Sequence, residues 1–383
     1  MPSYNAAVTS DESTSVSTAL TTRIQAAIVA AGGWLPFDRF MSMALYEPRL
    51  GYYARDSRQF GTLPSSGSDF VTAPELSPLF GRALAVQVAQ ALQATGTHEV
   101  WEFGAGSGAL AAQLLAALDG DVAYRIVDLS ATLRERQAER LAPFGERVRW
   151  LDALPDRFEG VVVGNEVLDA MPVQLLHFDG AMWFERGVAV ETGRLVFADR
   201  LTALRPPLEA PRDGSFQGAW VPGTTTEIHP QAEAFITTLA GLLRRGVAIF
   251  IDYGFPEAEF YLPQRHGGTL MCHQAHRADG DPLADVGLKD ITAHVNFTGI
   301  ALAGQNAGLD VIGYTSQARF LINCGLPALL EGATLAQRAN AQKLITEHEM
   351  GELFKVIAFA HGLPDHEVFE PIGFVQGDRM HRL

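Results

Sequence analysis

Three glycines separate a run of apolar residues from a helical pattern, in the segment WEFGAGSGALAAQLL: Gly104, Gly106 and Gly108. Glycine permits a sharp turn and lets a ligand approach the peptide groups, because no Cβ stands in the way. Asp128 ends the next predicted strand, where a carboxylate can accept hydrogen bonds from both hydroxyls of a ribose. This pattern indicates a nucleoside-containing cofactor.

Charge around the loop favours one such cofactor over another. Glu102 stands two residues before Gly104, whereas a dinucleotide site presents a helix N-terminus to pyrophosphate and keeps its loop free of negative charge. S-adenosyl-L-methionine carries a sulfonium and an ammonium, so nearby carboxylates are tolerated or favoured. We expect this methyl donor as the cofactor. A nicotinamide dinucleotide is one alternative, and a purely structural glycine turn is another.

A second polar group follows a buried apolar strand in the segment VVVGNEVLDAMPV: Asn165, Glu166 and Asp169. Residues at the carboxyl ends of strands in open α/β sheets face the ligand crevice. Two carboxylates there could hold a cationic guanidinium or amine, orient it and take its proton. We predict these residues as catalytic, with Glu166 the first candidate for the base. Asn165 and Asp169 could instead cap the following helix.

Other candidates lie at further strand ends and in one long loop. Asp152 could accept from the adenine amino group or occupy a surface turn. Asp252 and Tyr253 could face the substrate, or Tyr253 could simply cap the core. The Gly/Ser/Pro-rich segment 61–75 is interpreted as a lid over the cofactor, with a rigid connector as the alternative. Its candidates for cofactor binding are Thr72, Pro74 and Glu75.

Four histidines raise the question of a metal: His266, His273, His276 and His294. No HExxH motif or cysteine pair accompanies them, and methyl transfer needs no metal, so none is expected. We predict instead that His276 and His294 line the acceptor pocket, with Asp290 and Asn296 as neighbours. An ordinary hydrogen-bonded histidine is the alternative for each.

The elements that must position these residues form an α/β pattern from residue 98. Strands over 99–103, 124–128, 148–151 and 160–164 alternate with helices over 109–118 and 131–141. A helix over 231–245, a strand over 247–252 and a long loop follow. After the loop we expect a helix near 299–307, a strand over 310–315, a helical stretch over 317–351 and a last strand over 354–359. Such alternation is typical of right-handed βαβ units and a largely parallel sheet. The fold class is therefore α/β, with a Rossmann-like core.

Between residues 173 and 228 the pattern changes to short runs with period-two alternation. The pairs Asp179-Gly180 and Thr192-Gly193 are hairpin signals, so this segment is predicted as a mainly antiparallel β insertion. The predicted organisation is a flexible tail over 1–20, a helical N-terminal region with the lid over 21–97, the core over 98–172 and 229–361, and the insertion over 173–228.

Composition limits the classes of partner. The 383 residues are 47% hydrophobic with a net charge of −15, and no apolar run reaches the ~18 residues of a membrane span. Nucleic acid is not expected, because phosphate binding needs a positive surface. The Ser/Thr-rich first twenty residues lack the arginines of a mitochondrial transit peptide, and only two cysteines occur, so the cytoplasm is the default location. A homodimer through apolar N-terminal helices is a further option, without heptad support.

Several ordered segments together resemble the MidA-like methyltransferases that use S-adenosylmethionine, a family that includes a mitochondrial complex I assembly factor that methylates arginine. The resemblance covers about residues 33–360. It rests on FMSMALYEPRLGYY, DFVTAPELSPLFG, WEFGAGSG, GNEVLDAMPV, IDYGF and DPLADVGLKDITAHVNF. It implies a Rossmann-type class I methyltransferase core with a helical N-terminal region and an insertion before the fifth strand. Family members often have Glu where Asp128 stands, which keeps the carboxylate.

The resemblance implies a protein arginine as the methyl acceptor and hence a protein substrate. Two other classes of function remain as alternatives. One is a nicotinamide-dependent oxidoreductase that shares the glycine turn and Asp128. The other is an assembly factor or scaffold that keeps the fold but acts by binding a partner.

Overall fold

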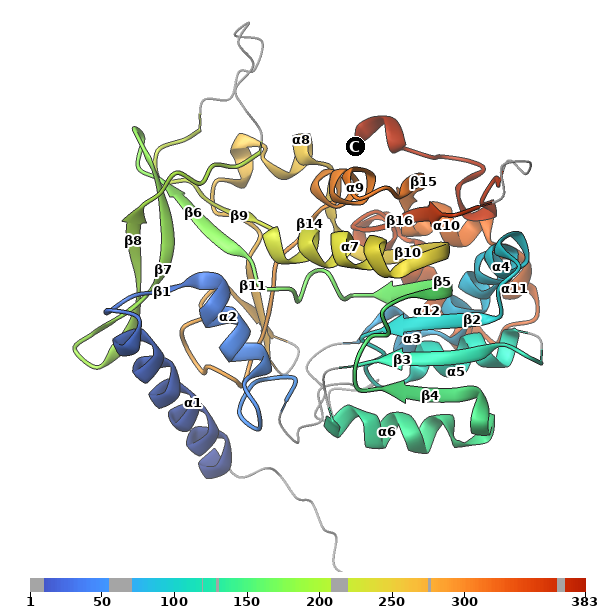
Figure 1. Cartoon of the computed structure of the whole chain (residues 1–383), viewed down its shortest axis with the longest axis horizontal. Helices are drawn as coiled ribbons and strands as arrows, with labels where there is room; N and C mark the ends of the chain where they lie inside the picture. Colours follow the sequence, from blue (N-terminus) through green and yellow to red (C-terminus); the bar gives the residue numbers. More distant parts are fainter. Residues whose placement is uncertain are drawn as a thin grey trace, which may run out of the picture. The chain divides into compact units, whose positions relative to one another are not determined.

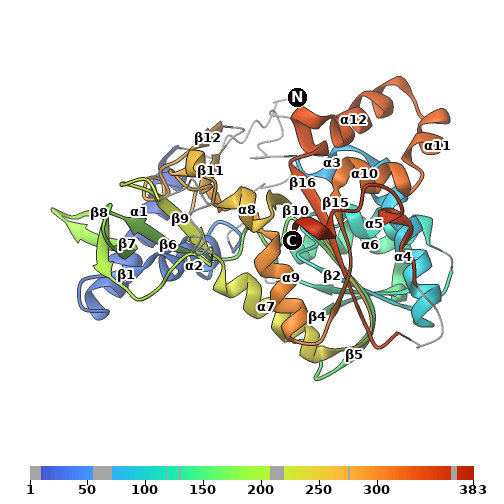
Figure 2. The ribbon, with the colours of Figure 1, turned by 90° about the horizontal axis from the view of Figure 1, so that it is seen from above.

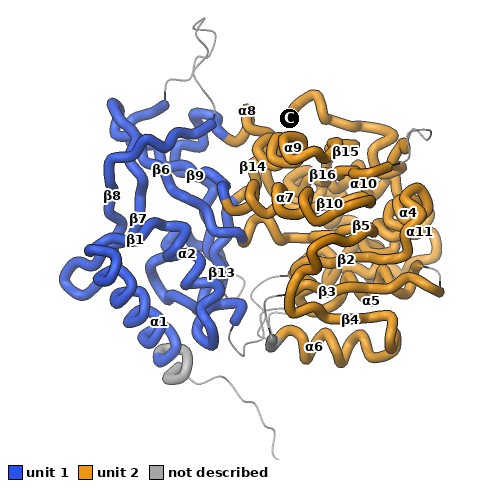
Figure 3. Tube along the Cα trace, in the orientation of Figure 1, with its two compact units in different colours: residues 1–59, 171–230, 261–293 blue, residues 60–170, 231–260, 294–383 orange. Residues whose placement is uncertain are grey.

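The computed structural model describes residues 10–54, 71–118, 120–128, 131–207, 220–274, 277–363 and 369–383. The chain divides into two compact units, coloured separately in Figure 3. Unit 1 comprises Met1–Gln59, Met171–Pro230 and Tyr261–Ala293, and unit 2 comprises Phe60–Ala170, Gln231–Phe260 and His294–Leu383. No helix among these described residues is long and apolar enough to cross a bilayer.

Unit 2 is built on one sheet with the strand order β4-β3-β2-β5-β10-β16-β15, and β14 pairs with β10 (Figure 1). Its neighbours pair in parallel except β16, which is antiparallel to both β10 and β15. The strands are β2 (Glu99–Phe103), β3 (Ala123–Val127), β4 (Val148–Leu151), β5 (Phe158–Asn165), β10 (Leu243–Phe255), β14 (Val295–Asn296), β15 (Asp310–Ser316) and β16 (Phe354–His361). The predicted Rossmann-like α/β fold is confirmed.

Helices cover both faces of this sheet (Figure 2), because alternate strand residues point to opposite sides. Ile249 and Ile251 of β10 join the core cluster with helices α4 and α5, whereas Phe250 between them contacts Phe235 of α7. The helices of unit 2 are α3 (Ala73–Leu76), α4 (Pro78–Thr95), α5 (Ala109–Ala117), α6 (Ala131–Leu141), α7 (Pro230–Leu242), α8 (Glu257–Phe260), α9 (Phe297–Asn306), α10 (Gln317–Asn323), α11 (Leu326–Glu331) and α12 (Leu335–Ile345).

Unit 1 is mainly antiparallel. One sheet has the order β1-β7-β6-β9 with β8 on β7, and a second has the order β12-β11-β13. At the β7–β8 hairpin, Thr192 and Gly193 both have positive φ, 48° and 78°, as a tight two-residue turn requires. Its elements are α1 (Ser10–Ala30), β1 (Leu35–Pro36), α2 (Phe37–Tyr46), β6 (Gln174–Phe178), β7 (Trp183–Glu191), β8 (Arg194–Leu201), β9 (Thr225–Ile228), β11 (Met271–Gln274), β12 (Arg277–Asp279) and β13 (Asp290–Thr292).

Three features of the predicted organisation were wrong. Residues 10–20, expected in a flexible tail, begin helix α1, whose Leu20, Ile24 and Ile28 recur every four residues and are buried. Helix α4, expected in a separate N-terminal region, packs in the core of unit 2. Residues 261–293, expected as a loop of the core, form β11, β12 and β13 within unit 1.

Candidate active site

The glycine loop, residues 104–108, follows β2 and leads into α5. Gly104, Gly106 and Gly108 have φ values of 64°, 53° and 77°, a left-handed conformation that side chains disfavour. A Cβ on Gly104 would also lie 3.1 Å from Cγ2 of Val167. The backbone of Gly104 is exposed, so a ligand can reach it. The loop is a turn that is open to contact at Gly104.

Asp128 follows β3 and is tied to this loop by one buried side chain. The amide of Gln137 donates to Asp128 Oδ2 at 2.8 Å and to the Gly106 carbonyl at 2.9 Å. Its oxygen accepts from the indole N–H of Trp150 at 2.8 Å. Gln137 is fully buried, so it cannot exchange these partners for water. The Asp128 carboxylate is thereby held beside the glycine loop.

Glu102 lies beneath the loop rather than at its surface. It is 2% exposed, and the hydroxyl of Tyr124 donates to its Oε2 at 2.8 Å. Burial raises the pKa of Glu102 to about 8, and the nearby Asp128 charge adds to the rise while the Tyr124 hydrogen bond opposes it. Glu102 therefore holds its proton at neutral pH and supports the loop as a neutral group.

The described end of the predicted lid contacts the loop through the short helix α3. The Pro74 carbonyl accepts from Nε2 of Gln113 at 2.7 Å. Glu75 is bonded to the Ser107 hydroxyl, and Nη1 of Arg140 donates to the same carboxylate at 2.7 Å. Thr72 precedes α3 without a side-chain cap bond. Residues 61–70 of the predicted lid lie outside the described residues.

The turn after β5 carries the predicted catalytic residues. Asn165 ends the strand, and its side-chain amide donates to Oε1 of Glu166 at 3.0 Å. Glu166 has a φ of 55°, a strained conformation for a non-glycine residue, and its N–H donates to the Ile251 carbonyl at 2.9 Å. The next three N–H groups, at residues 167–169, all donate to Oδ2 of Asp252.

Asp169 is the deepest carboxylate of this turn. It is 5% exposed, and its Oδ2 accepts from the Tyr253 hydroxyl. Its Oδ1 is buried and makes no hydrogen bond of good geometry, although the N–H groups of Asp169 and Ala170 lie near enough to favour the charged form. Burial raises the pKa of Asp169 to about 6. Asn165 Oδ1 is a second buried acceptor without a hydrogen-bond partner.

Asp252 is fully buried and serves the backbone. Besides the three bonds to Oδ2, its Oδ1 accepts from the Tyr253 N–H at 2.9 Å. Burial raises the pKa of Asp252 well above its usual range, and the charges of Asp169 and Glu166 raise it further. This geometry does not favour the predicted contact of Asp252 with substrate, because both of its carboxylate oxygens already accept hydrogen bonds from the backbone.

Aromatic rings pack around Tyr253, the hydrogen-bond partner of Asp169. The Tyr253 ring contacts His294 and Phe354 edge-to-face, with centroids 5.2 and 5.3 Å away. Phe255 also contacts His294. His294 is therefore brought to the predicted site, in contact with Tyr253.

The remaining candidates have partners of their own or lie outside the described residues. His276 lies outside the described residues. Asp290 belongs to unit 1, where it accepts from the Tyr53 hydroxyl at 2.9 Å, and Asn296 caps α9 by accepting from the Gly299 N–H. Asp152 is 85% exposed and pairs with Arg134 at 2.6 Å. Among the described residues, no three His, Cys, Asp or Glu side chains gather as a metal site.

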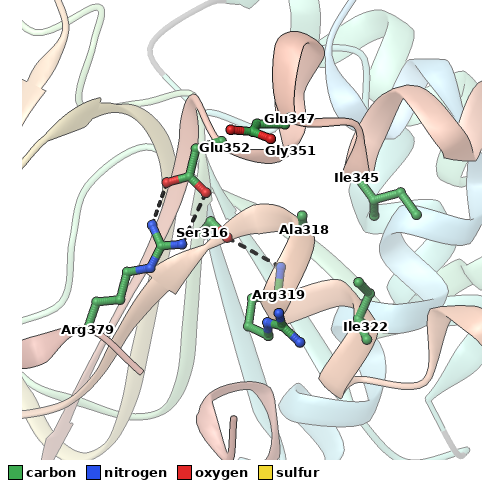
Figure 4. A pocket seen from close by; sticks show the side chains of 9 residues that line it. All are labelled: Ser316, Ala318, Arg319, Ile322, Ile345, Glu347, Gly351, Glu352 and Arg379. Carbon is green, nitrogen blue, oxygen red and sulfur yellow. Dashed lines mark hydrogen bonds and ion pairs between the residues drawn. The ribbon is translucent and has the colours of Figure 1, made fainter. Parts of the chain in front are cut away.

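A cavity of about 160 Å³ lies at the carboxyl end of β15 (Figure 4). Arg379 forms a two-pronged ion pair with Glu352 in its wall, and Ser316 caps α10 by accepting from the Arg319 N–H. None of the predicted site residues lines it. The cavity is separate from the glycine loop and the turn after β5.

A family model described as "Putative S-adenosyl-L-methionine-dependent methyltransferase" matches residues 83–315, which include the glycine loop, Asp128 and the turn after β5. The chain belongs to this methyltransferase family. As a member, it is a transferase that depends on S-adenosylmethionine, and the cofactor predicted from the glycine loop and Glu102 is confirmed.

Relatives and solved structures agree with this assignment. The methyltransferase is 26% identical to the mitochondrial "Protein arginine methyltransferase NDUFAF7 homolog" of Caenorhabditis elegans, with 84% of this chain and 80% of that protein covered. The Drosophila melanogaster homolog of the same description is 26% identical, with 90% and 85% covered. A crystal structure from Burkholderia thailandensis bound to S-adenosyl-homocysteine is 49% identical, covers 100% of this chain and 99% of that chain, and has a TM-score of 0.89.

The residues present fit the cofactor. The glycine loop offers peptide groups without side chains, and Gln137 presents the Asp128 carboxylate beside it, where ribose hydroxyls would donate. Glu102, protonated beneath the loop, acts as support rather than as a direct counter-charge. We therefore propose that the loop and Asp128 bind the cofactor.

Sequence reasoning missed the residues that connect these parts. Gln137, Trp150, Gln113 and Arg140 form the bonds described above, yet each lies in an ordinary helix or strand pattern. Gln137 and Arg140 are one turn apart on α6, the helix that comes next after Asp128 in the sequence. That location was the one signal that could have identified them.

Proposed function

We propose that this methyltransferase transfers the methyl group to a guanidino nitrogen of a protein arginine. The observation that carries the proposal is the set of acceptors after β5, where Asn165 Oδ1 and Asp169 Oδ1 are buried without good hydrogen-bond partners. A buried acceptor without a donor is costly, so the site favours a ligand rich in N–H groups. A guanidinium has five N–H donors in a planar fork that matches a carboxylate.

Two further observations support this acceptor. The curated relatives from Caenorhabditis elegans and Drosophila melanogaster are described as protein arginine methyltransferases. In addition, Glu166 and Asp169 place negative charge at the carboxyl end of β5, which complements a guanidinium that is protonated at neutral pH.

The residues of the turn would orient the acceptor and take its proton. Bound S-adenosylmethionine supplies an electrophilic methyl group. Asp169 and Glu166 hold the guanidinium through charge-assisted hydrogen bonds, which fixes one nitrogen for in-line attack. With a pKa of about 6, Asp169 is ionised at neutral pH and remains basic enough to accept the proton that the nitrogen loses. Asp169 thus replaces Glu166 as our first candidate for the base.

The test uses S-adenosylmethionine labelled in its methyl group and protein extract from cells that lack this enzyme. We expect label in methylarginine after acid hydrolysis with the wild-type enzyme, and at least roughly 100-fold less with Asp169→Asn, because general-base catalysis is worth about that factor. Asp152→Asn, at an exposed ion pair, is the matched control and should label normally. Label recovered only in another amino acid or in small molecules would refute the proposed acceptor.

A scaffold role makes a different prediction. A variant that loses the cofactor, such as Gly106→Val, would then still support the partner's assembly in cells. The cytoplasmic location and a homodimer stay predictions.

A further inference from the structure

Two consecutive residues of β10 stabilise the turn after β5, which carries Asn165, Glu166 and Asp169. Asp252 and Tyr253 make hydrogen bonds to the residues between Asn165 and Ala170. Neither has been given a role by the proposed function above. Their contacts are of two kinds, one to the backbone and one to a side chain.

Asp252 holds the backbone of the turn. A single oxygen, Oδ2, accepts from the N–H groups of Val167, Leu168 and Asp169 at 3.1, 2.9 and 3.2 Å. Three consecutive N–H groups converge on one atom only when the backbone curves around it. This curvature follows directly on the positive φ of Glu166, which local sequence does not favour. Asp252 is therefore the group that compensates the strained turn.

Tyr253 holds the side chain of Asp169. Its hydroxyl donates to Oδ2, which leaves Oδ1 as the buried acceptor without a good partner. The Tyr253 ring cannot turn freely, because His294 and Phe354 contact it edge-to-face. The plane of the Asp169 carboxylate is set by this bond.

We propose that Asp252 and Tyr253 are positioning residues: Asp252 fixes the turn that carries Glu166 and Asp169, and Tyr253 orients the Asp169 carboxylate so that Oδ1 receives the acceptor nitrogen. The inference deepens the proposed function and rests on it for the identity of the acceptor. The positioning itself depends only on the chain's own contacts.

The first test is Tyr253→Phe, which removes one hydroxyl and keeps the ring contacts. The titratable carboxyl groups around Asp169 are those of Asp252 and Glu166. Lys355 lies opposite Asp252 in the β10–β16 register, and its ammonium donates to the carbonyls of Glu352 and Leu353. Since the Tyr253 hydrogen bond lowers the pKa of Asp169, its loss should raise that pKa above about 6.

Carbon-13 carboxyl titration of the full-length protein, assigned with Asp169→Asn, measures this pKa without any acceptor. In the methylation assay, the acidic limb of the kcat profile should move to higher pH by a similar amount, with kcat lowered roughly 10-fold and S-adenosyl-homocysteine affinity unchanged. Tyr261→Phe is the matched control, because the Tyr261 hydroxyl donates to the Glu227 carbonyl at 3.0 Å within unit 1. An unchanged Asp169 titration in Tyr253→Phe would overturn the role of Tyr253.

The second test compares Asp252→Asn with Asp252→Ala by hydrogen exchange of the N–H groups of residues 167–169. Exchange should be fastest in the alanine variant and intermediate in the asparagine variant, which keeps one acceptor oxygen. Wild-type exchange in both would overturn the role of Asp252. If the alanine variant does not fold, exchange in the asparagine variant alone tests the role of Asp252.

Both readouts remain valid if arginine is not the acceptor. If the variants show the expected changes in exchange and in the Asp169 titration but no methylarginine forms, the proposed function is refuted and the positioning roles stand. If methylarginine forms but titration and exchange in the variants match those of the wild type, the proposed function stands and the positioning roles are refuted.

Discussion

Glu102 and Asp128 stand at neighbouring strands of the same sheet, yet they differ in burial and in hydrogen-bond partner. Glu102 is almost fully buried and bonded to a phenol, whereas Asp128 is half-buried and bonded to an amide. Desolvation penalises a charge in the first environment more than in the second. Glu102 therefore supports the loop as an acid, and we propose that Asp128 accepts hydrogen bonds from the cofactor.

Glu102 should make folding stability fall with rising pH. Its pKa is about 4.5 in the unfolded chain and about 8 in the folded one, so between these values the folded state binds the extra proton. Its stabilising contribution is complete below the lower value and is lost as pH rises toward about 8, by up to ~1.4 kcal/mol per pH unit. Urea unfolding at several pH values between about 5 and 8 should show a shallower decline in Glu102→Gln. If the free energy of unfolding declines equally with pH in the wild type and in Glu102→Gln, the raised pKa of Glu102 is contradicted.

Asp128→Asn should weaken S-adenosyl-homocysteine binding without unfolding the protein. A charge-assisted hydrogen bond contributes about 1.5–3 kcal/mol, so a loss of roughly 10- to 100-fold in affinity is expected by calorimetry. Asp152→Asn is the control, because that side chain is 85% exposed and paired with Arg134. A larger loss in Asp152→Asn than in Asp128→Asn would restore the adenine role predicted for Asp152.

At the scale of elements, the sequence predicted what short-range patterns encode. The glycine loop, Asp128 and the helix over 131–141 follow from glycine spacing and apolar periodicity, and α6 has those bounds. The predicted helix over 231–245 was too long: α7 ends at Leu242, and β10 begins at Leu243 because that residue pairs with Phe158. The pairing is long-range, so local helix propensity could not reveal it.

The same limit applies to the site and to the C-terminal helices. The expected helical stretch over 317–351 is divided at Gly325 and Gly332, which cap α11. Asp252 was predicted to face the substrate from a strand end, but its Oδ2 accepts instead from three backbone N–H groups, an arrangement that depends on the φ of Glu166. No sequence pattern specifies such a turn.

Helix α3 should contribute to cofactor affinity through its contact with the glycine loop. Glu75 joins Ser107 and Arg140, so Glu75→Gln should loosen this loop and weaken S-adenosyl-homocysteine binding about 3-fold, a modest effect because Arg140 is partly exposed. Glu99→Gln is the control, because its ion pair with Arg125 lies at the start of β2, away from the loop. Equal affinities for both variants would show that α3 does not influence the cofactor site.

For the whole molecule, cofactor binding should raise thermal stability. A ligand at about 100 times its Kd adds ~2.7 kcal/mol to the folded state, which corresponds to several degrees in Tm. Scanning calorimetry with S-adenosyl-homocysteine should show this rise in wild type and in Gly120→Ala, where a Cβ meets nothing within 4 Å. Gly106→Val should lose the rise, since valine disfavours a φ of 53°. A full rise in Gly106→Val would contradict the role of the loop.

The position of β16 has a consequence for synthesis on the ribosome. This strand follows all the other strands of its sheet in the sequence, yet it pairs between β10 and β15. Until Phe354–His361 has been translated, the edges of β10 and β15 that face it have no partner. Unpaired strand edges are templates for intermolecular pairing, and chains emerge N-terminus first. The nascent chain therefore carries an aggregation risk until its final segments are made, and a premature stop before Phe354 would remove an interior strand rather than a terminal appendage.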